Sequence, residues 1–282
     1  MRTSIPLPQR VLDFVEPAGL DDEAAREHAA NAVALDSPRK VQRRIEKFLR
    51  NPLLEAQTKR NVDVLVRLLA PYDASWALVS LGSGSGFELR ALLSARAFDP
   101  VYSSDLAWSA TSLVPQAVEP FEGRLGLFAA DFAALPRLDE PGRVTFVYLA
   151  LPHAQDPHSA LATLMGSEDE IVIVEPITNW LVELLARLRQ ARRVEYSGLQ
   201  PEWLRLDRVR QLADAHGHTM EVETWWEVPR SRLARRVRKS RRLSWPFVAA
   251  VRCVTIVTRP LRFGSVAAVR LRRPSDELHR AS

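Results

Sequence analysis

Three glycines alternate over five residues directly after an apolar run, and this segment constrains the fold more than any other. From position 79 the chain reads Val-Ser-Leu-Gly-Ser-Gly-Ser-Gly-Phe-Glu, with glycines at Gly82, Gly84 and Gly86. The apolar run 76–81 precedes them and the helix-like stretch 87–97 follows. A buried strand, a tight glycine turn and a helix start bring backbone N–H groups close to a nucleotide-like ligand. Dinucleotide turns need G-x-G-x-x-G, and Phe87 occupies the third glycine position, which argues against a nicotinamide-dependent oxidoreductase.

From residue 76 onward, short apolar runs alternate with helical patterns. Strands are expected at 76–81, 101–104, 125–129, 144–150, 170–175, 220–226 and 265–271, with helices between them at 87–97, 107–117, 156–166, 177–190 and 203–215. This alternation predicts an α/β fold in which helices cover both faces of a mostly parallel sheet. Ligands of such sheets bind at the carboxyl ends of the strands, which is where the glycines lie.

Composition divides the chain into four predicted segments. Residues 1–75 read as an N-terminal helical cap, with helical patterns at 21–35, 37–49 and 54–69. The core spans 76–227, a basic and apolar insertion spans 228–264, and the last strand with a polar tail spans 265–282.

Two acidic residues follow neighbouring predicted strands. Asp105 ends the second strand, where a carboxylate can accept hydrogen bonds from both ribose hydroxyls. Asp131 follows the third strand, where it can accept from an adenine amino group. The alternative is that each is only a turn or capping residue.

The order of these features resembles the class I S-adenosylmethionine-dependent methyltransferases over residues 76–226. The resemblance implies a Rossmann-like, seven-stranded sheet with an antiparallel last strand and S-adenosyl-L-methionine as the cofactor. The resemblance implies that the glycine loop contacts the methionine part of the cofactor. It also implies that Asp105 binds the ribose and that Asp131 binds the adenine amino group. The predicted cofactor site comprises Gly82, Ser83, Gly84, Gly86, Asp105, Leu106, Asp131, Phe132 and Leu149. Ser80 departs from the family, which often has an acid there, and Glu88 could take part of that role.

The acceptor side is expected at the ends of the fourth and fifth strands. His153 could accept a proton from a hydroxyl or amine, or it could be a loop histidine bonded to backbone. Glu175 could line the acceptor pocket or bond nearby backbone, and Trp180 is a candidate pocket wall. No His, Asp and Glu cluster has convincing metal spacing, so no metal is expected.

Positive charge is concentrated late in the chain. The net charge is +5, and no acidic residue occurs between Glu227 and Asp276. An arginine-rich run, 230–242, leads into the apolar stretch 243–258 with Trp245 and Phe247. The segment is open to several interpretations: a solvated face, contact with a membrane surface through 230–258, nucleic-acid binding, a substrate lid or a homodimer surface.

The single cysteine excludes an internal disulfide, and no signal peptide or membrane span is recognised. A cytoplasmic protein, or one peripheral to the membrane, is therefore expected. The predicted reaction is methylation of an oxygen or nitrogen of a small molecule, such as a natural product, a lipid or a sugar-like acceptor. The alternatives are an RNA methyltransferase and a non-catalytic binding protein that retains the fold.

Overall fold

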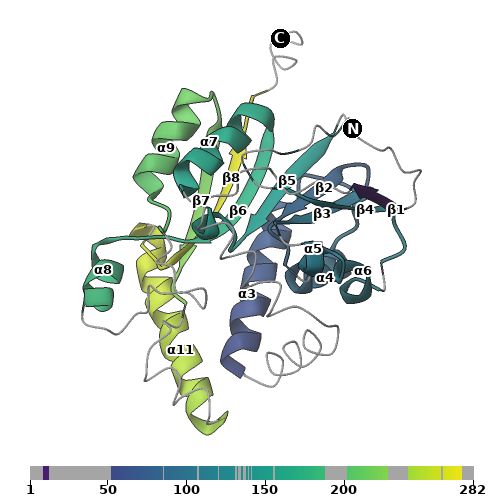
Figure 1. The fold of residues 1–282 in the computed structure, drawn as a ribbon. Coiled ribbons are helices and arrows are strands. Elements are labelled where there is room, and N and C mark those ends of the chain that lie inside the picture. Colours follow the sequence, from purple (N-terminus) through teal and green to yellow (C-terminus); the bar gives the residue numbers. More distant parts are fainter. Residues whose placement is uncertain are drawn as a thin grey trace.

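An eight-stranded sheet forms the centre of the protein in its computed structural model (Figure 1). The structure describes residues 9–12, 52–84, 86–106, 108–119, 121–130, 132, 135, 138, 140, 142–154, 156–187, 202–227, 241–261 and 263–274. The strands are β1 (Gln9–Leu12), β2 (Ala77–Leu81), β3 (Val101–Asp105), β4 (Leu125–Ala129), β5 (Arg143–Tyr148), β6 (Glu170–Pro176), β7 (Thr219–Trp225) and β8 (Val266–Arg272).

The strand order is β1-β4-β3-β2-β5-β6-β8-β7. Along this order, each strand from β1 through β4, β3, β2 and β5 to β6 is parallel to the next. Strand β8 is antiparallel to both of its neighbours, β6 and β7. All seven predicted strands are present within a residue or two of their expected bounds, and the last is antiparallel as expected. The predicted fold class is confirmed.

The eighth strand corrects the prediction that residues 1–75 are helical. Gln9–Leu12 pairs in parallel with Leu125–Phe128 of β4. Without β1, the outer edge of β4 would leave backbone N–H and C=O groups unpaired. The pairing therefore depends on this distant strand and not on the local propensity of residues 9–12. The helical patterns at 21–35 and 37–49 lie outside the described residues. The third pattern forms helix α3 (Pro52–Leu68).

The described residues form seven further α-helices, most of which flank the sheet. They are α4 (Phe87–Ala95), α5 (Trp108–Thr111), α6 (Val114–Ala117), α7 (Pro157–Ser167), α8 (Trp180–Arg187), α9 (Leu206–Ala215) and α11 (Arg241–Thr258), with short 3₁₀ turns η2 (Leu151–His153) and η3 (Arg259–Leu261). One helix was expected over 107–117, and this is wrong: α5 and α6 are separate. Pro115 has no N–H to donate to the preceding turn, so the helix is interrupted before it.

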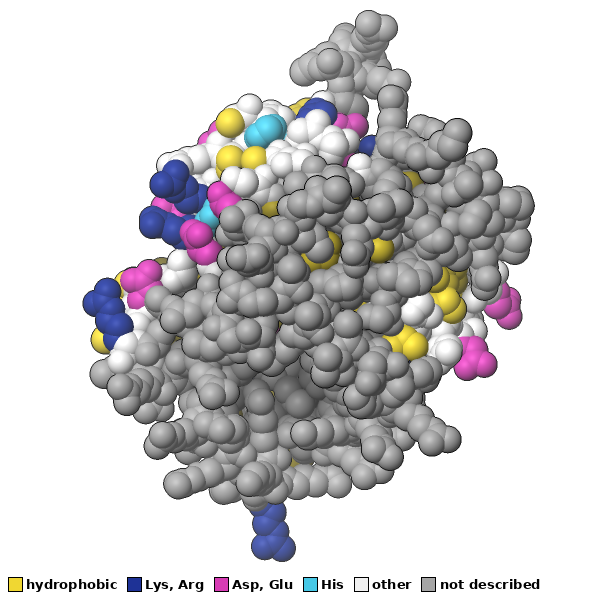
Figure 2. Space-filling view, viewed as in Figure 1, with side chains coloured by type: hydrophobic (Ala, Val, Ile, Leu, Met, Phe, Trp, Pro, Cys, Tyr) yellow, Lys and Arg dark blue, Asp and Glu magenta, His cyan; other side chains and the backbone are white. Residues whose placement is uncertain are grey.

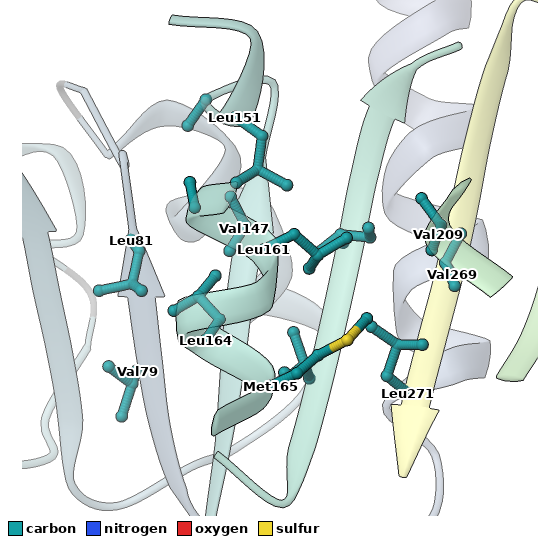
Figure 3. Close-up of a cluster of buried hydrophobic side chains, with 14 of the residues drawn as sticks. Val79, Leu81, Val147, Leu151, Leu161, Leu164, Met165, Val209, Val269 and Leu271 are labelled. Atoms are coloured by element: carbon teal, nitrogen blue, oxygen red, sulfur yellow. The ribbon is translucent and has the colours of Figure 1, made fainter. Parts of the chain in front are cut away.

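Both faces of the sheet are covered. On one face, side chains of α7 and α9 pack on the inward residues of β2, β5, β6 and β8 (Figure 3). On the other face, α3 and α4 pack on alternate residues of the same strands. Val147 and Phe146 are adjacent in β5 yet belong to opposite clusters, as the two-residue period of a strand requires. Helix α3 is therefore part of the hydrophobic core that covers this face of the sheet.

A buried polar network lies at the amino end of β6, the edge opposite the glycine loop. The Tyr72 hydroxyl donates to the Glu170 carboxylate, and Arg270 Nε donates to the Tyr72 oxygen over 2.9 Å. Arg272 Nε lies 3.0 Å from the other Glu170 oxygen. Burial, followed by the Glu170 carboxylate, raises the pKa of Tyr72, so the hydroxyl stays protonated and continues to donate. The network joins the segment before β2 to β6 and β8.

Charged side chains of both signs lie close together around the starts of α7 and α9, and Figure 2 shows such mixing on this side of the molecule. Arg205 pairs with Asp207 at 2.8 Å, and His158 lies 3.7 Å from Glu202. Such interleaving is typical of a solvated surface.

Candidate functional site

The glycine loop turns sharply between β2 and α4, and all three of its glycines have positive φ. The values are 66° at Gly82, 52° at Gly84 and 77° at Gly86. A Cβ on Gly82 would lie 2.2 Å from the Cβ of Ala150, so no larger residue fits there. Nothing lies within 4 Å of the corresponding position on Gly84, so that side of the loop is open. The loop is therefore tight against the sheet at one glycine and accessible to a ligand at the next.

The end of β3 holds this loop in place. The Gly84 N–H donates to Asp105 Oδ2 over 2.9 Å. The Ser83 N–H donates to the Ser104 carbonyl at 2.9 Å, and the Ser83 hydroxyl lies 2.6 Å from that of Ser103. Two parts of the predicted cofactor site, the loop and the acid after the second strand, are thus in direct contact.

Other predicted cofactor residues occupy the same edge of the sheet. Leu106, half-buried, directly follows β3. The Phe132 ring would lie 3.8 Å from a Cβ on Gly82, which places it beside the loop. Asp131 lies outside the described residues, so its adenine role stays a prediction. Ser80 is buried within β2, and Glu88 lies in the first turn of α4.

The turn after β5 has a strained backbone, and a buried carboxylate accepts hydrogen bonds from its N–H groups. Leu149 has a φ of 52°, which is unfavourable for a side chain branched beyond Cβ. Glu175 Oε1 accepts the N–H groups of Ala150 at 2.8 Å and Leu151 at 3.0 Å. Glu175 is 1% exposed, and its other oxygen, Oε2, is buried with no hydrogen-bond partner among the residues that the structure describes. Burial raises the pKa of Glu175 to about 8. Of the two alternatives for Glu175, the backbone contact is observed; its place in a substrate pocket stays a prediction.

Three residues that were not singled out from the sequence form a polar cluster at this edge. Asn61 Nδ2 of α3 donates to the Tyr148 hydroxyl at 2.7 Å and to Glu227 Oε1 at 3.0 Å. Burial, and then the carboxylates of Glu88 and Glu227, raise the pKa of Tyr148 well above its ordinary value. Tyr148 therefore stays protonated and can donate. Asn61 could have been noticed, because it is a polar residue at helical spacing from the apolar Val64 and Leu65.

The predicted acceptor-side residues are not all brought together. His153 ends η2 and is half-buried, at the edge where it was expected. His158 has a structural contact: its Nε2 accepts the Arg205 N–H at 3.3 Å. Trp180 is 68% exposed at the start of α8, where its ring stacks on Phe263 at 5.8 Å. Roles for His153 and Trp180 in catalysis or in a pocket wall stay predictions.

A cleft between α3 and α11 leads to the polar cluster. The space inside it is about 30 Å³, which has room for only one or two water-sized groups. Its walls carry Trp225 and Trp226 from the end of β7, and Val248 and Val251 from α11. Glu227 lines the cleft and also accepts a hydrogen bond from Asn61. The walls carry further polar side chains, namely Gln57, Arg60, Arg252 and Thr255.

No protein-family model and no curated protein matches the sequence. Solved structures match it at low identity. Magnesium protoporphyrin IX methyltransferase from Synechocystis PCC 6803, with bound S-adenosylmethionine, is 14% identical with a TM-score of 0.51, covering 90% of this chain and 99% of that one. The small RNA methyltransferase HEN1 is 12% identical with a TM-score of 0.54, covering 77% of this chain and 25% of that one. The [4+2]-cyclase SpnF is 13% identical with a TM-score of 0.51, covering 76% and 80%.

The chain has the class I methyltransferase fold. The glycine loop and Asp105 occupy the edge of this fold at which its ligands bind. Proteins that share the fold include a porphyrin methyltransferase, an RNA methyltransferase and a cyclase. The fold therefore leaves the substrate class open, and the substrate must be argued from the site.

Proposed function

We propose that the protein transfers a methyl group from S-adenosyl-L-methionine to an oxygen or nitrogen of a small molecule. The observation that carries this proposal is the hydrogen bond from the Gly84 N–H to Asp105, 2.9 Å long. It joins the glycine turn after β2 to the carboxylate at the end of β3, so that one site offers both a close backbone approach and an acceptor for ribose hydroxyls.

The described residues fit this cofactor. Gly84 leaves open space where a side chain would stand, and Gly82 lets the loop lie against Ala150. In the proposed complex the loop would hold the methionine part and Asp105 the ribose hydroxyls. The cofactor supplies an electrophilic methyl group on a sulfonium, so the protein's task is to orient the acceptor and exclude water.

The acceptor is proposed to lie at the ends of β5 and β7. The protonated Tyr148 hydroxyl can donate a hydrogen bond there, and Asn61 fixes the position of its oxygen. The Glu227 carboxylate offers acceptor oxygens in the cleft. Because the cleft has room for only a small group, this combination suits an acceptor that places one small polar end there. His153 is the candidate to accept the proton released by that polar end.

Isothermal titration with S-adenosyl-L-methionine tests the proposal. Wild-type protein should bind, and Asp105→Ala should weaken binding by about tenfold or more, because a charge-assisted hydrogen bond contributes about 1.5–3 kcal/mol. Asp207→Ala is the matched control, since Asp207 is an exposed acid in the first turn of α9 whose partners are the surface Arg205 and backbone N–H groups of the same turn. Folded wild-type protein that does not bind, or equal affinities of wild type and Asp105→Ala, would refute the proposal.

A further inference from the structure

Helix α11 packs through one face and exposes apolar side chains on the other. Its inner stripe includes Ser244, Val248 and Thr255, which are buried, and Val248 packs against α3. On its other sides, Trp245 is 52% exposed, Ile256 70% and Val257 75%. A surface helix normally turns polar residues to water, so this outward face lacks the usual polarity.

The apolar surface continues onto η3 and α8. Leu261 of η3 and Trp180 of α8 are both exposed. Phe263 stacks on Trp180 and meets the Trp226 ring edge-on at 5.5 Å, and Trp226 Nε1 donates to Thr258 Oγ1 of α11 at 3.1 Å. This chain of contacts ties α8 to the end of α11, and Figure 1 shows the two helices on the same side of the molecule. We call the exposed apolar residues of α11, η3 and α8 the outer patch.

The charge around the outer patch is positive. Arg242 and Arg252 are exposed on α11. The sequence contains no acidic residue between Glu227 and Asp276, and α11 is directly preceded by the arginine-rich run 230–240. In a two-fold dimer through this patch, the arginines of α11 would find a carboxylate only at Glu183 of α8, which is half-buried, because α11 and η3 contain no acidic residue. An anionic lipid surface offers phosphates for the arginines and an apolar layer for the side chains between them.

We propose that the outer patch docks on an anionic lipid bilayer, with α11 lying in the plane of the interface. Trp245, Ile256 and Val257 enter the boundary between headgroups and acyl chains, while Arg242 and Arg252 reach the phosphates. None of the described helices meets the length and hydropathy needed to cross the bilayer, and a peripheral mode of binding needs no crossing. This inference does not depend on methyl transfer.

Co-sedimentation of the full chain with vesicles tests the docking. One set of vesicles is phosphatidylcholine alone, and the other contains equal parts of phosphatidylcholine and phosphatidylglycerol. Wild-type protein should pellet with the anionic vesicles and weakly with the neutral ones. Ile256→Glu with Val257→Glu should lower the partition coefficient by more than about tenfold, because two exposed apolar side chains lose their burial in lipid.

The matched control adds the same charge elsewhere: Gln211→Glu with Ala215→Glu, both exposed on α9, should leave binding unchanged. Arg242→Gln with Arg252→Gln should weaken binding to anionic vesicles only. Melting temperature and S-adenosyl-L-methionine affinity, measured on every variant, show that a loss of vesicle binding is not a loss of folding. Absence of wild-type binding, equal effects of the α11 and α9 pairs, or a dimer that the α11 pair dissociates without any vesicle binding would overturn the proposal.

Discussion

The backbone N–H of Gly84 and the carboxylate of Asp105 lie 2.9 Å apart, which joins the turn after β2 to the last residue of β3. The two strands are neighbours in register, with Leu81 opposite Ser104, so the turn and the acid meet because the sheet aligns their ends. The parallel sheet thus positions one wall of the proposed cofactor site before any ligand arrives.

Gly82→Ala should destabilise the protein by more than about 2 kcal/mol and weaken binding of S-adenosyl-L-methionine. The added Cβ would stand 2.2 Å from that of Ala150, in a left-handed conformation that costs about 1–2 kcal/mol on its own. Urea unfolding measures the loss. Combining it with Ala150→Gly removes the clash and should recover part of the stability. Gly166→Ala is the control, because that helical position has open space and should gain stability. Equal effects at Gly82 and Gly166 would contradict this account of the loop.

Glu175→Gln should change how stability depends on pH. The folded pKa of about 8 lies above the ordinary value of 4.5, so folding favours the protonated carboxyl. That contribution is fully present below pH 4.5 and is lost as the pH rises through 8. The glutamine keeps an oxygen for the Ala150 and Leu151 N–H groups and does not ionise. The free energy of unfolding of wild type should therefore fall relative to the variant between pH 5 and 8, at up to about 1.4 kcal/mol per pH unit. Parallel pH profiles of the two proteins would show that Glu175 is not held in this way.

The hydrogen bond between Asn61 and Tyr148 should appear as a coupling energy. Asn61→Ala and Tyr148→Phe each remove one partner of a 2.7 Å contact. A double-mutant cycle from urea unfolding should give a coupling of about 0.5–1.5 kcal/mol. Pairing Asn61→Ala with Thr163→Ala, an exposed residue of α7, supplies a cycle whose coupling should be near zero. Additive effects in the first cycle would mean that the contact contributes nothing.

Tyr72→Phe should cost about 1–3 kcal/mol of stability without altering cofactor affinity. It leaves the buried Glu170 and Arg270 each short of a hydrogen-bond partner, at the edge of the sheet opposite the glycine loop. Arg67→Met is the comparison, because Arg67 is largely exposed and its 2.9 Å pair with Glu223 should contribute less than about 1 kcal/mol. A larger loss from Arg67→Met than from Tyr72→Phe would reverse the expected ranking of buried and exposed pairs.

Local sequence features predicted the strands and the glycine turn correctly. Strand β2, Gly82 and the acid at the end of β3 each follow from residues adjacent in the chain, since apolar runs and glycine spacing are local signals. The sequence pattern does not predict the split between α5 and α6, because the apolar residues keep their helical spacing across it. Pro115 is the local feature that marks the split.

Contacts between distant segments could not be obtained from the sequence. Strand β1 depends on the open edge of β4, and the polar cluster joins Asn61 of α3 to Glu227 after β7. The bonds from Glu175 to the turn after β5 likewise need the relative placement of two strands. Their positions follow from tertiary packing, which composition and periodicity do not encode.

The position of β8 has a consequence for how the protein is made. Strand β8 follows β7 in the sequence but lies between β6 and β7, hydrogen-bonded to both. During synthesis, β7 emerges from the ribosome without a partner in the sheet, and one edge of β6 stays open until residues 266–272 follow. The strands that carry the glycine loop can pair early, whereas the half of the sheet that borders the cleft is completed last. Nascent chains halted before β8 should therefore expose two strand edges and be the species most in need of a chaperone.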